Sequence, residues 1–161
     1  METSRLILRQ WKRADFSIFA ELNSDIHTMQ YFPDVLSRKE SDSLVNKIKQ
    51  FISINGWGFW AIEIKATGKF ARYVGLNRSK SNLPPSPCIE IGWRLLRRHW
   101  GFGYATEAGV RALKYAFNIL QLNEIVAFTT LENKKSIAVM NRLGMINTRK
   151  NFVHPNIDSS N

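Results

Sequence analysis

Short runs of alternating or β-branched apolar residues recur along the chain and predict six strands. In "IEIGWRL", apolar residues alternate with Glu90, Gly92 and Arg94, the pattern of a half-buried strand. A short link containing Gly68 separates two of the runs, so these two are expected to form an antiparallel hairpin. The predicted strands cover residues 5–10, 60–64, 70–76, 89–95, 124–130 and 145–153.

Apolar residues spaced three and four apart predict four helices among these strands. In one of them Ser37 and Glu40 form a capping box at the start, and Gly56 is suited to the C-cap. Another begins after a glycine turn at 101–103, and the last ends at Gly144. Their apolar positions are Phe16, Phe19 and Leu22; Leu44, Val45, Ile48, Phe51 and Ile52; Val110, Leu113, Ala116, Phe117 and Leu120; and Ala138, Met140 and Leu143, which we expect to face inward.

The order of the elements predicts the fold class. Strands and helices come first and are followed by a β-α-β-α-β series, which indicates an α/β (α+β mixed) fold with a central mixed β-sheet and helices on both faces. The length of 161 residues suits one domain, expected over residues 1–157 with a short tail at 158–161. The proline-rich stretch "SKSNLPPSPC" is expected to be a loop.

Composition excludes several classes of protein. Hydrophobic residues make up 44% and charged residues 22%, which is typical of a folded domain rather than a disordered chain. No apolar run reaches the about 18 residues that a membrane helix needs, and the N-terminal stretch does not resemble a secretory signal. The single cysteine, Cys88, forms no internal disulfide and fits a reducing cytoplasm. The three histidines and the cysteine have no metal-ligand spacing, so we expect no metal site.

The chain is strongly basic, with a formal net charge of +10 and a pI of about 10.1. Such a charge favours anionic partners such as phosphates, nucleic acid or acidic protein surfaces. The lysines and arginines are spread along the chain, however, so a solvated basic surface is an equally good interpretation. No nucleic-acid motif and no aromatic residues interleaved with a basic face are found.

The stretch "RRHWGFGYATEA" has the features of an anion site. A strand, a glycine turn and a helix start bring free backbone N–H groups together, and the helix dipole adds partial positive charge there. Gly101 and Gly103 have no Cβ, so a phosphate can approach the main chain closely. Position 106 is threonine, whereas a dinucleotide site would need a third glycine there, and no Gly-Lys-Ser/Thr of a P-loop is present.

The same stretch resembles a known family. Arg98-His-Trp-Gly101-Phe-Gly103 fits the Arg/Gln-x-x-Gly-x-Gly/Ala signature of the GNAT superfamily of N-acetyltransferases. The longer string "EIGWRLLRRHWGFGYATEA" and the later "NKKSIAVMNRLGM" are similar to the RimJ/RimL-like branch. The resemblance runs from about Thr3 to Ile157. It implies a GNAT-like sheet with a V-shaped cleft between two parallel central strands, here 89–95 and 124–130.

The resemblance implies acetyl-CoA as co-substrate, with no metal. Main-chain N–H groups from Arg98 to Tyr104 would bind its pyrophosphate, and pantetheine would lie in the cleft like an added strand, bonded to the main chain near Trp93 and Leu95. Asn133 would bind the pantetheine arm. The implied cofactor-binding residues are Trp93, Leu95, Arg98, His99, Gly101, Phe102, Gly103, Tyr104, Ala105 and Asn133.

Acetyl transfer to an amine by direct attack in a ternary complex requires a neutral amine and a proton for the departing thiolate. The family places a glutamate at Glu90, which makes this residue the expected base; an ordinary exposed carboxylate on a half-solvated strand is the alternative. Ser136 matches the serine that would protonate the thiolate. Asn133 and Ser136 are also good helix N-caps, and this interpretation stays open.

The resemblance leaves the acceptor open between a protein N-terminal amine, as on a ribosomal protein, and a small-molecule amine. Its pocket would involve "DIHTMQYFPD" and "SKSNLPPSPC", with Tyr31, Phe32 and Trp57 as candidate lining residues, although core packing explains these three equally well. A basic enzyme of this kind could be drawn to ribosomal RNA, which is the one indirect link to nucleic acid.

The family continues after "FVHPN" with one more strand, which is not found in this sequence. That difference suggests either that residues 145–153 pair differently or that a second chain, as in a homodimer, covers the gap. It also raises the alternative of a degenerate GNAT module that binds CoA without turnover.

Overall fold

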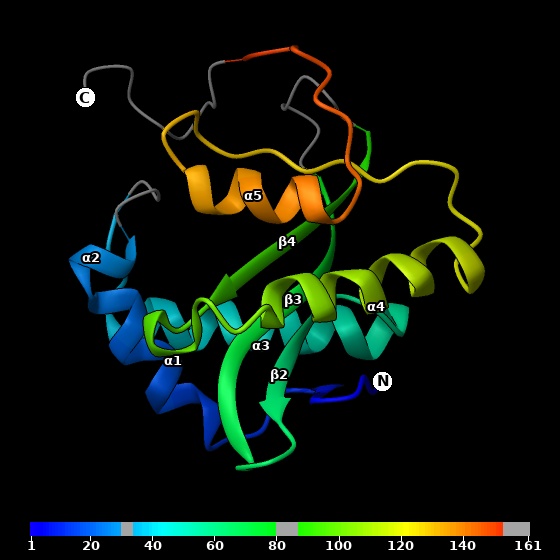
Figure 1. Cartoon of the computed structure of the whole chain (residues 1–161). Helices are drawn as coiled ribbons and strands as arrows, with labels where there is room; N and C mark the ends of the chain where they lie inside the picture. The colour runs from blue at the N-terminus through cyan, green and yellow to red at the C-terminus, as the bar shows by residue number, and fades with distance from the viewer. Residues whose placement is uncertain (30–33, 80–86, 153–161) are drawn as a thin grey trace.

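The structure is a computed structural model that describes residues 1–29, 34–79 and 87–152 (Figure 1). Its elements follow one another as β1 (Leu6–Arg9), α1 (Asp15–Ser24), α2 (Ile26–Met29), α3 (Arg38–Asn55), β2 (Phe59–Ile64), β3 (Lys69–Arg78), β4 (Ile89–Leu95), the 3₁₀ turn η1 (Arg97–His99), α4 (Tyr104–Asn118) and α5 (Lys134–Arg142).

Four strands form one sheet in the order β1-β2-β3-β4, and each pairs with its neighbour in antiparallel fashion. The expected hairpin is confirmed as β2–β3, whose turn holds Gly68 at a φ of 65°. A β-bulge interrupts this pair, because Ile62 lies opposite Arg72 while the adjacent Glu63 lies opposite Phe70. Arg72 consequently has a φ of 112°, a conformation that side chains rarely adopt.

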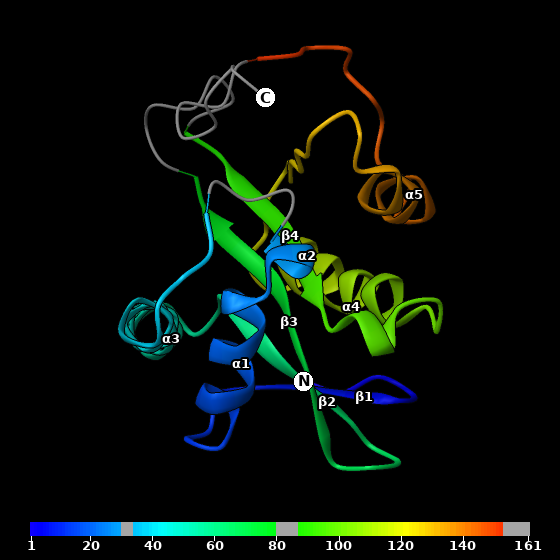
Figure 2. The ribbon, with the colours of Figure 1, turned by 90° about the vertical axis from the view of Figure 1, so that its left-hand side faces the viewer.

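Helices cover both faces of the sheet, as the fold class predicts. Figure 2 shows α1 and α3 on one side of the strands and α4 and α5 on the other. The core between these layers includes Trp11, Phe19, Val45 and Ile62, all buried, and on the α4 side Ala112. Small residues of α4 face the sheet: Ala108, Gly109, Ala112 and Ala116 are buried, whereas Val110 and Phe117 are exposed.

The sequence signals at the ends of α3 are confirmed. The Ser37 hydroxyl accepts a hydrogen bond from the Glu40 main chain, and the Glu40 carboxylate accepts one from the Ser37 N–H, which completes the capping box. Gly56 takes the left-handed conformation with a φ of 76° and closes the helix.

Two predicted strands are not formed. The segment 124–130 makes one parallel bridge, between Glu90 and Val126, and no strand is found over residues 145–152; Val153 lies outside the described residues. A period-two pattern indicates an extended chain, but pairing also needs a neighbouring strand, and 124–130 has only the start of β4 beside it. The parallel part of the mixed sheet is thus reduced to one bridge.

Helix α5 forms where expected but is less buried than expected. It has no fully buried residue, and Ala138, Met140 and Leu143 are only partly covered. Its main support is α4: the Leu143 side chain lies against Gly109, where an added Cβ would come within 3.0 Å of it.

No helix in the described part of the chain is long and apolar enough to cross a membrane.

Candidate active site

The turn between β4 and α4 combines a 3₁₀ turn with two left-handed glycines. The His99 N–H donates to the Leu96 carbonyl at 2.8 Å, and the Trp100 N–H donates to the Arg97 carbonyl at 3.1 Å. Gly101 and Gly103 then have φ values of 82° and 77°. A Cβ at Gly101 would meet no atom within 4 Å, so the main chain is open to an approaching ligand at this point.

Backbone donors converge at the start of α4. Gly103 is the N-cap residue and provides no side-chain cap. The N–H groups of residues 101–106 have no acceptor among the described residues, so they are available to a bound anion. Helix α4 is 15 residues long and adds its dipole. Of the N–H groups expected to bind the pyrophosphate, from Arg98 to Tyr104, those of His99 and Trp100 are used within the turn, and those of Gly101 to Tyr104 stay available.

His99 adds no positive charge to the turn at neutral pH. Burial lowers the pKa of its imidazole, and the nearby Arg98 and Lys69 lower it further. Its Nε2 also accepts a hydrogen bond from Arg98 Nε at 3.4 Å. The positive side chains of the turn are therefore Arg97 and Arg98.

Aromatic rings line the outer side of the turn. The rings of Phe102 and Tyr104 stack with centroids 5.6 Å apart and an interplanar angle of 16°. The guanidinium of Arg5 lies 4.8 Å from the centre of the Tyr104 ring. Phe102 itself is 57% exposed, so it is accessible to a ligand at the turn.

Glu107 ties the N-terminal segment to the first turn of α4. Its carboxylate accepts hydrogen bonds from Thr3 Oγ1 at 2.5 Å, from Ser4 Oγ at 3.2 Å and from the Arg5 N–H at 2.9 Å. It also pairs with the Arg5 guanidinium at 2.6 Å. From the sequence, only an interaction with the helix dipole could be suggested for an acid in this position. These contacts place Arg5 next to the glycine turn.

We expect Glu107→Ala to lower the free energy of unfolding by about 1–3 kcal/mol, because it leaves several donors of residues 3–5 without their acceptor. Burial would raise the pKa of Glu107, but the hydrogen bonds from Thr3 and Arg5 outweigh it and lower the pKa. The stabilisation is thus present above the unfolded-state pKa of about 4.3 and is lost as the pH falls through the lower folded-state value. Urea titrations at pH 7 and pH 3 test this, with the exposed Glu132→Ala as control; equal losses for both variants would contradict it.

The edge of β4 that faces 124–130 is paired only at its beginning. The Val126 N–H donates to the Ile89 carbonyl at 3.1 Å, and the Ile91 N–H donates to the Val126 carbonyl at 2.8 Å. Alternation along the strand directs the main-chain groups of Trp93 and Leu95 to the same edge. On this edge the Leu95 carbonyl accepts from Trp100 Nε1 at 2.9 Å, while the main chain of Trp93 has no partner among the described residues.

Glu90 lies where this edge begins to open. Asn77, its partner on β3, donates from Nδ2 to Glu90 Oε1 at 2.8 Å. The carboxylate is half-buried, and this hydrogen bond orients it.

Asn133 and Ser136 lie at the start of α5. Asn133 is the N-cap residue, and its Oδ1 accepts from the Ser136 N–H at 3.1 Å, which confirms the capping interpretation for Asn133. Lys135, between them, lies with its Nζ 4.0 Å from the centre of the Trp100 ring. This contact brings the start of α5 to the glycine turn. No hydrogen bond joins Ser136 to Glu90 in the described part of the chain.

The expected acceptor pocket is only partly described. Tyr31, Phe32 and most of the loop 79–88 lie outside the described residues. Trp57 is buried and packs edge-to-face against Phe51, with ring centroids 5.0 Å apart, so it is a core residue.

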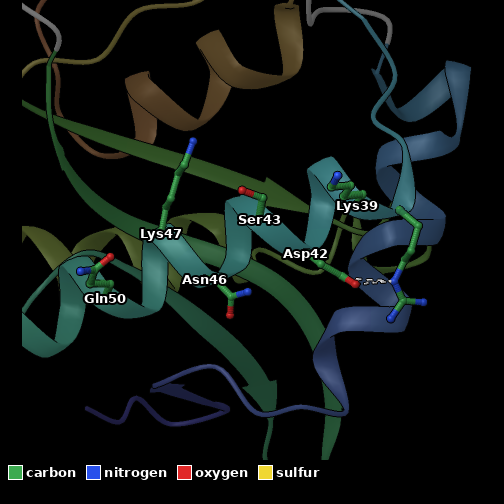
Figure 3. Close-up of a pocket in the computed structure, with 7 residues that line it drawn as sticks. Lys39, Asp42, Ser43, Asn46, Lys47 and Gln50 are labelled. Carbon is green, nitrogen blue, oxygen red and sulfur yellow. Dashed lines mark hydrogen bonds and ion pairs between the residues drawn. The ribbon is translucent and has the colours of Figure 1, made fainter.

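A shallow hollow on the solvent side of α3 lies apart from all of these groups (Figure 3). Polar side chains line it, and its one ion pair joins Arg38 to Asp42 at 2.9 Å. None of the predicted site residues contributes to it. The described residues also contain no cluster of three His, Cys, Asp or Glu side chains that could hold a metal ion.

Comparison with known proteins identifies the family of this chain. The model of the acetyltransferase (GNAT) domain family matches residues 5–146. The chain is 32% identical over 144 residues to the Bacillus subtilis protein YkkB, covering 89% of this chain and 83% of YkkB. It is 31% identical over 149 residues to the uncharacterized N-acetyltransferase YnaD of the same organism, covering 89% of this chain and 80% of YnaD.

Solved structures give the same result. The acetyltransferase from Agrobacterium tumefaciens aligns with a TM-score of 0.79 and 28% identity over 89% of this chain and 81% of that chain. A spermidine N-acetyltransferase from Vibrio cholerae, solved in complex with CoA and spermine, aligns with a TM-score of 0.68 and 26% identity over 88% of this chain and 81% of that chain.

Proposed function

Because this chain belongs to the GNAT acetyltransferase domain family, we propose that it transfers the acetyl group of acetyl-CoA to a primary amine. The observation that carries the proposal is the β4–α4 turn, with two left-handed glycines and free N–H groups from Gly101 to Thr106. The "RRHWGFGYATEA" and "NKKSIAVMNRLGM" motifs support the RimJ/RimL-like branch. The single cysteine supports a cytoplasmic location.

The residues present fit acetyl-CoA. Free donors and a helix N-terminus suit a diphosphate, and the open space at Gly101 lets it reach the main chain. Arg97 and Arg98 add charge, and the exposed Phe102 adds apolar surface. The unpaired main chain of Trp93 suits an amide-bearing arm, which the Asn133 side chain would also bind.

Acetyl-CoA supplies an activated thioester, and the chain supplies the proton transfers. Glu90 takes the proton of the amine, directly or through a water molecule, as the nitrogen forms its bond to the acetyl carbon. The Ser136 hydroxyl gives a proton to the sulfur as the carbon–sulfur bond breaks, and it regains a proton from solvent. Both substrates must be bound together, so no acyl-enzyme is needed.

The amine acceptor belongs to one of two classes in this proposal: a protein N-terminal amine or a small-molecule amine. An α-amine, with a pKa of about 7.7–8.0, is already partly neutral at pH 7, so a weak base suffices for it. A lysine-type or polyamine nitrogen, at about 10.4, needs a stronger base.

Thermal melts with and without acetyl-CoA test the proposal. At 100 times its dissociation constant, the ligand should stabilise the fold by about 2.7 kcal/mol, a rise of several degrees in Tm. Release of free thiol with a panel of amines then tests turnover. A shift without turnover would favour the CoA-binding module without activity, and no shift would overturn the proposal.

A further inference from the structure

Two arginines are buried side by side on the α1 face of the sheet. Arg72 of β3 is 0% exposed, and Arg94 of β4 is 8% exposed. Both guanidinium groups donate to Oδ1 of the buried Asn23 of α1, Arg72 through Nη2 and Arg94 through Nη1. In turn, Asn23 Nδ2 donates to Ser41 Oγ of α3 at 2.9 Å, which fixes the orientation of the amide.

Arg72 lacks a counter-charge in the described part of the chain. It takes part in no ion pair, and its Nε and Nη1 have no hydrogen-bond partner. Residues 30–33 and 80–86 contain no Asp or Glu, and residues 153–161 contain one, Asp158. Burial lowers the pKa of the Arg72 guanidinium to about 9, and the charge of Arg94 contributes. Burying a charge in this way is costly unless an anion compensates it.

The backbone at Arg72 adds a second cost. Its φ of 112° at the bulge belongs to the region that suits glycine. The bulge turns the side chain onto the α1 face, where the guanidinium lies 5.0 Å from the centre of the Phe19 ring. Residues strained in this way cluster at active sites and ligand-binding sites.

The arginine pair lies beside the candidate active site. Arg94 shares one face of β4 with Glu90, four residues earlier, so their Cα atoms are about 13 Å apart. Arg72 is the register partner of Leu95, at the far end of the open strand edge. Met29 of α2 is buried beside the pair, and its Sδ contacts Arg94 Nη2. A methionine side chain is flexible enough to give way to a ligand.

We propose that Arg72 and Arg94, held by Asn23, bind an anionic group, a carboxylate, of the amine acceptor. This inference rests on the proposed function and narrows its substrate class. The acceptor carries a carboxylate roughly 10 Å from its reacting amine, the length of an extended tripeptide. A polyamine acceptor would instead meet two like charges.

Calorimetric titration in the presence of CoA, which allows no turnover, tests the site with triglycine and its C-terminal amide. The two peptides share their amine and differ in the carboxylate. We expect triglycine to bind about tenfold more tightly or better, since charge-assisted hydrogen bonds are strong. Equal affinities, or binding of neither peptide, would overturn the proposal.

Arg72→Gly is the informative variant, because glycine suits the backbone and removes the buried charge. It should keep or raise the Tm, keep the shift with acetyl-CoA and lose the preference for triglycine. The exposed Arg13→Gln removes the same charge at the surface and should keep the preference. A preference that survives in Arg72→Gly overturns the assignment, whereas loss of the acetyl-CoA shift in the unmodified protein would overturn the proposed function instead.

Discussion

Gly103→Val is expected to abolish the stabilisation of this protein by acetyl-CoA. Gly103 is the N-cap residue of α4 at a φ of 77°, and a β-branched residue cannot adopt this conformation without strain. Relief of the strain would rotate the neighbouring N–H groups out of their common direction. An added Cβ would also lie 3.5 Å from Arg5 Nη2 on the outer side of the turn. The rise of several degrees in Tm expected with acetyl-CoA should therefore disappear.

Gly56→Val provides a matched control. Gly56 has nearly the same φ, 76°, with no atom within 4 Å of an added Cβ, but it ends α3 and lies outside the turn. Both variants should lose stability without ligand, and only Gly56→Val should still respond to acetyl-CoA. A full response from Gly103→Val would show that the turn does not bind the cofactor.

Glu90→Gln is expected to reduce turnover by about 100-fold or more while leaving the acetyl-CoA shift unchanged. General-base catalysis contributes about 10²–10⁴-fold, and glutamine retains the shape of glutamate but cannot take a proton. The Asn77 amide that donates to Glu90 Oε1 can still donate to the glutamine oxygen, so the strand pair should keep its geometry. Steady-state thiol release measures the effect on turnover.

The exposed Glu124→Gln, at the start of the neighbouring segment, is the control and should keep its activity. If Glu90→Gln remains within a few-fold of the unmodified enzyme, Glu90 is not the base and the amine is deprotonated before it binds. If it loses the acetyl-CoA shift as well, Glu90 supports the cleft instead of the proton transfer.

Local signals predicted the local structure. The Ser37–Glu40 box and Gly56 delimit α3, and Gly68 marks the hairpin, because each acts on main-chain groups within a few residues of itself. Gly101 and Gly103 predicted the turn between β4 and α4 for the same reason. The sequence did not predict that the His99 and Trp100 N–H groups bond within the turn, since these 3₁₀ bonds depend on how the chain leaves β4.

Features that depend on contacts between residues distant in the sequence could not be predicted from it. Arg94 occupies a polar position in an alternating strand, yet α1 and α2 bury it. The run 124–130 has strand composition, but the extent of its pairing depends on which chain lies beside it. Glu107 contacts Thr3 and Arg5, which lie more than 100 positions away, and the spacing of apolar and polar residues does not predict such a contact.

The contacts between Glu107 and residues 3–5 affect the order in which the domain folds. Strand β1 pairs with β2, about 55 residues later, and the segment before it donates hydrogen bonds to Glu107. During synthesis the first residues must therefore wait until two-thirds of the chain has emerged. Contacts this distant in sequence form slowly, because a long loop has to close first. The support beneath the glycine turn should therefore be among the last parts of the domain to form, and its amide protons should gain protection late in refolding.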